Sequence, residues 1–326
     1  ADYPIATSMI TEFSNTRQRA FSIGFIAAMW YVGATCADLV GYWLYDVEGG
    51  WRWMLGSAVI PCILILIGRF DLPESPRWLL RKGRVKECEA MMIKLFGEPV
   101  VFDEEAPQET RFLQLFNRRH FPFVLFVAAI WTCQVIPMFA IYTFGPQIVG
   151  LLGLGAGKSA ALGNVVISLC FMLGCIPPMF WLNSAGRRPL LIGSFIMMTL
   201  ALAVLGLIPD MGAWLVVLAF AVYAFFSGGP GNLQWLYPNE LFPTDIRASA
   251  VGVIMSLSRI GTIVSTWALP VFITKYGISN VMLMGAGISL IGLLVSIAFA
   301  PETRGLTLAQ TSQMTIRSKP VTRASY

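Results

Sequence analysis

Charged side chains stand inside apolar runs of this sequence at three positions. Asp38 lies in TCADLVGYW, Arg259 in SLSRIGTI and Asp2 in the apolar segment ADYPIATSMITEF. A charge at the centre of a bilayer costs about 2.5–3.5 kcal/mol on insertion scales, so such residues are expected to serve function. Carboxylates there carry protons and Arg side chains bind anions. The alternatives are an interhelical Asp–Arg pair, or an Asp38 carboxylate that reaches to the membrane surface.

Residue sets for catalysis or nucleotide binding are missing. His120 is the single histidine, which leaves HExxH and triad chemistry without its parts. The six cysteines form no CxxC pair and five lie in apolar runs, so we expect small buried hydrophobes. GAGKS (155–159) resembles a phosphate-binding loop, but that motif needs Gly where Leu152 stands. We expect no enzyme, no metal and no cofactor.

The composition predicts an all-α integral membrane protein. Of 326 residues, 56% are hydrophobic and 13% charged, against about 25% charged in soluble domains. A spanning helix needs roughly 20 mostly apolar residues. Eight runs meet this requirement, and residues 1–13 resemble the end of a ninth. The eight runs are 20–45, 53–72, 120–149, 159–182, 189–208, 212–237, 248–273 and 278–300.

Basic residues follow the alternation that these spans impose. If the 14–19 loop faces the cytoplasm, 18 Lys and Arg lie in loops on that side and three on the other. This asymmetry is typical of inner-membrane topology. The basic residues are read as topology signals, so no nucleic-acid partner is expected despite the net charge of +5. The polar segment 73–119 is expected to hold short amphipathic helices.

An internal repeat relates two parts of the chain. TEFSNTRQRA (11–20) and NELFPTDIRA (239–248) match at an offset of 228 residues, and the same offset relates the Pro-Glu pairs at 73 and 301. Two related halves are therefore predicted. Residues 120–301 form a complete six-helix half, and residues 1–72 form the remainder of the other. Residues 73–119 form a cytoplasmic linker, and 302–326 a cytoplasmic tail. Projection of the repeat predicts about 110 further residues before Ala1.

Loop motifs carry a family resemblance. PESPRWLLRKGR (73–84), GRR (186–188), WLYPNELFPTDIRA (235–248) and PETRG (301–305) resemble the sugar porter branch of the major facilitator superfamily. The resemblance implies a twelve-helix fold, of which eight complete helices and part of a ninth are expected here. It also implies a cytoplasmic gate of paired charges. Topology signalling alone is the alternative for these residues, which are Glu12, Arg19, Glu74, Arg77, Arg187, Arg188, Glu240, Arg247 and Glu302.

The resemblance also implies residues of a central binding site. Trp235, Gln134 and Tyr142 match cavity positions of the family, with ordinary packing as the alternative for each. The QQ and G-x-N elements that bind sugar hydroxyls are missing beside Gln134, which favours an organic acid bound by Arg259. Asp2 lies in a stretch similar to the proton path of phosphate–proton symporters. Asp2 or Asp38 is therefore expected to take a coupling proton. The segment Gly228–Gly231 is expected to interrupt its helix and let neighbouring backbones approach.

These features predict a secondary transporter of a small metabolite, either an organic acid or a sugar-like compound, driven by protons through alternating access. The partners expected are the lipid bilayer, a small-molecule substrate and H⁺, with the chain monomeric. The predicted location is the bacterial inner membrane, with the C-terminus in the cytoplasm. A membrane substrate sensor on the same fold, or a truncated fragment that transports nothing, remains an alternative.

Overall fold

A computed structural model describes residues 10, 19–70, 74, 79, 83–96, 112–151, 157–208, 212–304 and 311. The chain divides into two compact units. The larger unit comprises Ala1–Asp46 and Phe112–Tyr326, and the smaller unit comprises Val47–Arg111. The predicted boundaries near 72, 119 and 301 remain predictions.

The described residues of the smaller unit form three helices. α3 (Gly50–Ser57) continues into α4 (Val59–Arg69) with Ala58 in helical conformation between them, and α6 (Val85–Phe96) follows. α6 is the short helix expected within the polar segment. The side chains of α4 are exposed, including Ile60 and Leu64. An apolar helix without a buried face suits a lipid surface.

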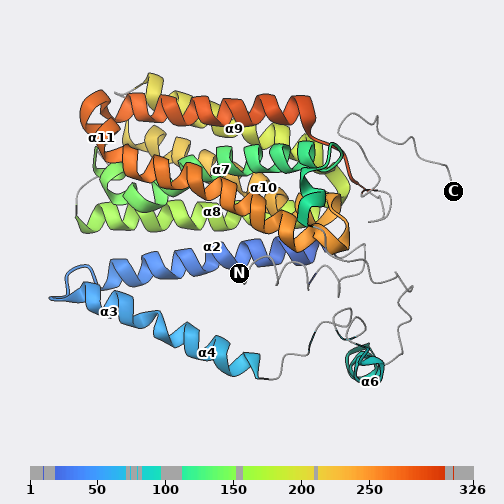
Figure 1. The fold of residues 1–326 in the computed structure, drawn as a ribbon. Helices are drawn as coiled ribbons and strands as arrows, with labels where there is room; N and C mark the ends of the chain where they lie inside the picture. The colour runs from blue at the N-terminus through green and yellow to red at the C-terminus, as the bar shows by residue number, and fades with distance from the viewer. Residues whose placement is uncertain are drawn as a thin grey trace. The chain divides into compact units, whose positions relative to one another are not determined.

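The larger unit is a bundle of long apolar helices, drawn in Figure 1. α9 has 21 residues, which at 1.5 Å per residue matches a hydrocarbon layer of about 30 Å. α7 contains a non-helical residue, Phe144. The bundle helices are α2 (Arg19–Trp43), α7 (Phe121–Leu151), α8 (Lys158–Ala185), α9 (Arg187–Leu207), α10 (Ala213–Leu241) and α11 (Thr244–Phe299), and the short η1 (Phe112–Phe116) precedes α7.

The described residues give seven continuous apolar helices rather than the eight predicted spans. The predicted spans 248–273 and 278–300 both lie within α11. This helix is not regular throughout, because Gly277 has φ 80° and ψ 163° inside it. A positive φ of this kind is easily adopted only by glycine. Because α11 is continuous apart from Gly277, the seven helices do not establish the predicted count of eight spans and part of a ninth.

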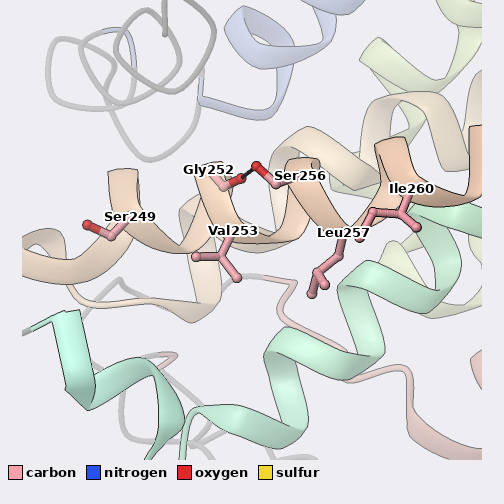
Figure 2. A pocket seen from close by; sticks show the side chains of 6 residues that line it. All are labelled: Ser249, Gly252, Val253, Ser256, Leu257 and Ile260. Carbon is pink, nitrogen blue, oxygen red and sulfur yellow. Dashed lines mark hydrogen bonds between the residues drawn. The ribbon is translucent and has the colours of Figure 1, made fainter. Parts of the chain in front are cut away.

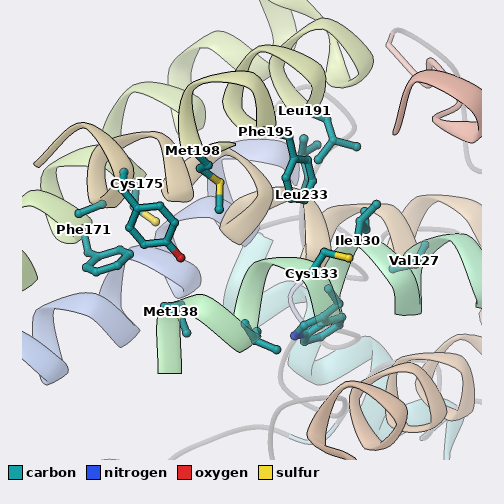
Figure 3. Packing of buried hydrophobic residues seen from close by; sticks show 14 of the residues in the cluster. Val127, Ile130, Cys133, Met138, Phe171, Cys175, Leu191, Phe195, Met198 and Leu233 are labelled. Carbon is teal, nitrogen blue, oxygen red and sulfur yellow. The ribbon is translucent and has the colours of Figure 1, made fainter. Parts of the chain in front are cut away.

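Most of the helices that pack together in the bundle are not consecutive in the sequence. α2 packs on α8, α8 packs on α10, and α10 packs on α9, while α11 packs on both α7 and α9. The buried side chains between them are mainly aliphatic and aromatic, as Figure 3 shows for part of the core. Phe171 and Phe195 are fully buried there. These contacts bring polar residues from distant parts of the sequence together.

Glycines let α8 and α10 approach backbone to backbone. A Cβ atom added at Gly228 would lie 2.2 Å from the carbonyl oxygen of Gly174, and one added at Gly174 would lie 2.1 Å from that of Phe225. The approach predicted for the segment Gly228–Gly231 is thus confirmed. The predicted helix interruption is wrong, because α10 runs through it from Ala213 to Leu241. Helices at membrane depth tolerate such Gly and Pro residues when neighbours satisfy the backbone.

The cysteine prediction is correct only in part. Cys88, Cys133 and Cys175 are buried, but Cys36 and Cys62 are exposed. Cys36 lies on α2 and Cys62 on α4. Apolar surroundings in the sequence therefore did not distinguish a buried helix face from an exposed one.

Candidate functional site

A small cavity lies between α2, α7, α10 and α11. Its volume of about 30 Å³ is enough to hold a water molecule. Most of the lining is aromatic or aliphatic. The described residues that line it are Ala27, Trp30, Tyr31, Trp131, Val135, Met138, Phe139, Gly231, Gln234, Trp235 and Arg259.

Arg259 is the charged residue among the described residues that line this cavity. Its guanidinium carbon lies 5.0 Å from the centroid of the Phe139 ring. A cation over an aromatic face is stabilised by the ring quadrupole, and Arg suits this role because its planar group is weakly hydrated. Arg259 thus brings a positive charge to the wall of an otherwise aromatic site.

Trp235 is the second predicted residue that lies in the cavity wall. Its indole packs edge-on against Trp131 from α7, with ring centroids 4.8 Å apart and an interplanar angle of 68°. Edge-to-face packing of this kind fixes ring orientation. The two indoles form a rigid surface on which an apolar part of a ligand can rest.

Gln134 and Tyr142 lie near the cavity but not in its lining. Gln134 is fully buried, and its amide nitrogen donates to Ser227 Oγ at 2.9 Å and to Met138 Sδ at 3.3 Å. The Tyr142 ring packs edge-on against Trp30, with centroids 5.6 Å apart. Both residues therefore support side chains that line the cavity.

Sequence reasoning missed Trp30, Tyr31 and Gln234. Trp30 and Tyr31 are adjacent aromatic residues in the middle of an apolar run, a pattern equally typical of lipid contact. Gln234 stands one residue before Trp235 and one helical turn after Gly231. A polar side chain on the same helix face as the predicted Trp235 was the available signal.

Asp38 joins α2 to α8. Its carboxylate accepts a hydrogen bond from Asn164 Nδ2 at 3.1 Å and another from the hydroxyl of Ser168. A Cβ atom at Gly145 would overlap Asn164, so α7 also packs closely on this polar group. Among the described residues, Asp38 thus bonds to an amide and a hydroxyl rather than to Arg259. For Asp38 the geometry does not favour reach to the membrane surface, and a pair between Asp2 and Arg259 stays a prediction because Asp2 lies outside the described residues.

A buried ion pair joins the start of α9 to the end of α10. Arg187 Nη2 lies 2.7 Å from Glu240 Oε1, and their side chains are only 6% and 7% exposed. Arg187 Nη1 also donates to the carbonyl oxygen of Leu182 at 3.0 Å. The hydroxyl of Thr303 donates to the second carboxylate oxygen of Glu240 at 2.5 Å. The pair is therefore held by neutral neighbours on both sides, as a buried charge pair requires.

Glu302 caps α9 from the segment that follows α11. Its carboxylate accepts the backbone N–H groups of Arg187 and Arg188, each at 3.1 Å, and that of Arg304 at 3.0 Å. A carboxylate at a helix N-terminus is stabilised by the helix dipole and by these otherwise unpaired donors. Gly186, with φ 92°, makes room, since a Cβ atom there would lie 2.7 Å from the Glu302 carboxylate. The Arg188 side chain donates to the carbonyl of Ile297 at 2.8 Å.

The structure thus brings four predicted gate residues together: Arg187, Arg188, Glu240 and Glu302. Arg247 is buried near the start of α11, and Glu74 is exposed in the smaller unit. Arg19 begins α2, and its backbone alone is described. Asp2, Glu12 and Arg77 lie outside the described residues.

A second hollow lies on the outer face of α11 and is shown in Figure 2. Its lining is small and mostly apolar, with Ser249, Gly252 and Ser256 along one face. The hydroxyl of Ser256 donates to the carbonyl of Gly252 at 2.8 Å. Small residues in this arrangement are typical of helix packing in membranes rather than of ligand binding.

A bundle of apolar helices around a small, largely aromatic cavity, with a charge cluster at the ends of three elements, is the arrangement expected of a membrane transporter. The chain belongs to the major facilitator superfamily and, within it, to the sugar transporter family. The family profile described as "Sugar (and other) transporter" matches residues 1–315. This membership places the chain among multi-pass membrane transporters.

Two relatives from Escherichia coli (strain K12) show the same membership. One, named as a candidate metabolite transport protein, YaaU, is 90% identical over 98% of this chain and 72% of its own length. The other, the inner membrane metabolite transport protein YgcS, is 33% identical over 94% of this chain and 69% of its own.

The fold agrees with a solved structure of the proton:xylose symporter XylE bound to 6-bromo-6-deoxy-D-glucose. The TM-score is 0.78, with 19% sequence identity over 94% of this chain and 69% of that one. This likeness establishes a major facilitator fold. The substrate of the present chain has to be argued from its own cavity.

Proposed function

We propose that this protein is a secondary transporter that carries a small organic acid together with a proton by alternating access. The observation that supports it most is the position of Arg259 in an aromatic cavity between helices. Transporter sites lie between helix bundles near the membrane midplane. The names of two relatives, which describe metabolite transport, agree with such a role.

Arg259 supplies the affinity for a carboxylate. A guanidinium pairs with both oxygens of a carboxylate, and Arg does so with little loss of ordering entropy. The Phe139 ring, whose centroid lies 5.0 Å from the guanidinium carbon, stabilises the same cation through its face. An acidic ligand can therefore bind Arg259 while its apolar part lies on Trp235.

Substitution of Arg259 by Gln is expected to lower uptake of organic acids at least about tenfold, because a hydrogen bond to a charged group contributes about 1.5–3 kcal/mol. The measurement is counterflow of a panel of labelled organic acids in proteoliposomes that contain the full-length protein. Labelled glucose serves as the neutral control. Arg259→Lys should recover part of the activity. Undiminished acid uptake by Arg259→Gln would remove this residue from the binding site.

Asp38 is proposed to carry the coupling proton, with Asp2 as the other candidate from the sequence. The carboxylate lies between α2 and α8, helices that belong to different halves of the predicted repeat. Protonation would remove the charge that Asn164 and Ser168 now stabilise. It would therefore change how strongly the two halves hold each other.

Asp38→Asn is expected to abolish accumulation driven by a pH gradient while leaving counterflow without a gradient largely intact. The amide keeps the size of the side chain but cannot bind the proton. Asp46→Asn is the matched control, because Asp46 forms an exposed pair with Lys158 at 2.5 Å. Gradient-driven accumulation that survives in Asp38→Asn would transfer the proton role to another residue.

The cluster around Arg187 and Glu240 is proposed as part of the cytoplasmic gate. Its position between the ends of three elements allows it to hold them together in one state and release them in another. The proposed topology places this cluster and the C-terminus on the cytoplasmic side of the inner membrane, with the protein acting as a monomer.

A further inference from the structure

The sulfur atom of Met138 on α7 accepts two hydrogen bonds, one from α2 and one from its own helix. The Tyr31 hydroxyl from α2 donates to its sulfur at 3.5 Å, and the Gln134 amide donates to the same atom at 3.3 Å. A thioether sulfur is a weak acceptor. Since Tyr31 and Met138 both line the cavity, a ligand oxygen that entered it would be a better partner for the Tyr31 hydroxyl.

Gly231 provides the space that this hydroxyl occupies. A Cβ atom at Gly231 would lie 3.0 Å from the Tyr31 oxygen, so the hydroxyl rests directly on α10. Gln234 follows Gly231 by three residues, which places it on the same face of that helix. Tyr31 and Gln234 are thereby brought to one side of the cavity.

Gln234 offers a polar atom that the described structure does not use. The side chain is 7% exposed and lines the cavity, yet its Oε1 has no hydrogen-bond partner among the described residues. Buried polar atoms in native proteins are almost always paired with protein, water or ligand. An unpaired amide oxygen at a ligand cavity therefore indicates a donor that arrives with the ligand.

We infer that Tyr31 and Gln234 form a subsite for substrate hydroxyl groups beside Arg259. This inference rests on the proposed function and narrows its substrate class to a polyhydroxylated carboxylate. Tyr31 donates to a substrate oxygen and Gln234 accepts from a substrate hydroxyl. The guanidinium of Arg259 binds the carboxylate, and the indoles of Trp30 and Trp235 contact the C–H faces between the polar groups.

Three compounds with six-membered rings distinguish recognition of hydroxyl groups from recognition of a carboxylate. Glucuronate carries hydroxyls and a carboxylate, glucose carries hydroxyls alone, and cyclohexanecarboxylate carries a carboxylate alone. Their dissociation constants are measured by tryptophan fluorescence of the purified full-length protein. Glucuronate is expected to bind most tightly, because sites built to hydrogen-bond a hydroxyl discriminate strongly against analogues that lack it.

Gln234→Leu is expected to weaken glucuronate binding about tenfold and leave cyclohexanecarboxylate binding unchanged. Unchanged binding of that acid also shows that the variant folds. Gln114→Leu, which removes an exposed glutamine, is the matched control and should change neither constant. Arg259→Gln should weaken both acids.

Two of the following outcomes separate this inference from the proposed function. Equal affinity for glucuronate and cyclohexanecarboxylate, or no effect of Gln234→Leu on glucuronate, would overturn the hydroxyl subsite and leave the carboxylate site standing. Glucose binding that depends on Gln234, without any effect of Arg259→Gln, would support the subsite and contradict the transport of acids. Failure of all three compounds to bind would overturn the inference.

Discussion

Arg187→Met is expected to destabilise the folded protein by about 3–5 kcal/mol, because it leaves the Glu240 carboxylate buried without its cation. The two side chains are 6% and 7% exposed, so water cannot replace the lost partner. The measurement is chemical unfolding in detergent micelles. A double variant, Arg187→Met with Glu240→Gln, should recover part of the loss. Removing both charges leaves no unpaired ion, and neighbouring effects of this kind are not additive.

An exposed pair in the same chain provides the control. Arg84 lies 2.5 Å from Glu87, but their side chains are 48% and 57% exposed. Water and salt screen such pairs, so Arg84→Met should leave unfolding unchanged. If both substitutions had equally small effects, the Arg187–Glu240 pair would be solvent-screened, and its role in closing the gate would be lost.

Gly228→Val is expected to reduce the stability of the bundle by about 3 kcal/mol or more, with a corresponding loss of folded protein. The added Cβ atom would lie 2.2 Å from a carbonyl oxygen of α8, and backbone cannot move aside as a flexible side chain can. Separation of α8 from α10 would also disturb the cavity wall that α10 supplies. The yield of monodisperse protein and its thermal unfolding measure the effect.

The same substitution at Gly193 is the matched control. This glycine lies in α9, and a Cβ atom there would meet nothing within 4 Å. Gly193→Val should therefore be tolerated. A Gly228→Val protein as stable as the parent would show that α8 and α10 do not meet backbone to backbone.

The sequence predicted the helical membrane fold because apolar run length and charge asymmetry depend directly on the bilayer. Several gate residues, such as Arg187 and Glu240, were predicted from the family resemblance of the loop motifs that contain them. Which of these charged residues pair with each other was harder to predict from the sequence. The repeated segment NELFPTDIRA contains both Glu240 and Arg247, which suggested that these two residues pair. The ion pair that the structure gives for Glu240 joins it to Arg187 instead. Adjacency in sequence does not determine which helix ends meet in space.

The cavity was predictable only where a residue stood out by type. Arg259 and Trp235 were found because a charge in a span and a tryptophan beside a loop motif are unusual. Tyr31 and Gln234 were missed because their roles depend on a missing Cβ atom at Gly231 and on helix packing order. The interruption at Gly277 agrees with the run pattern, because the predicted spans 248–273 and 278–300 end on either side of it.

The carboxylate of Glu302 couples two helices mechanically. It follows α11 and holds the first N–H groups of α9, so the two helices cannot part without losing those bonds together. If the two helices move together as one rigid unit, none of these hydrogen bonds is lost. Gly277, whose φ is positive, lies between this unit and the first part of α11, which bears Arg259. The proposed gate movement would therefore reach Arg259 through the part of α11 around Gly277.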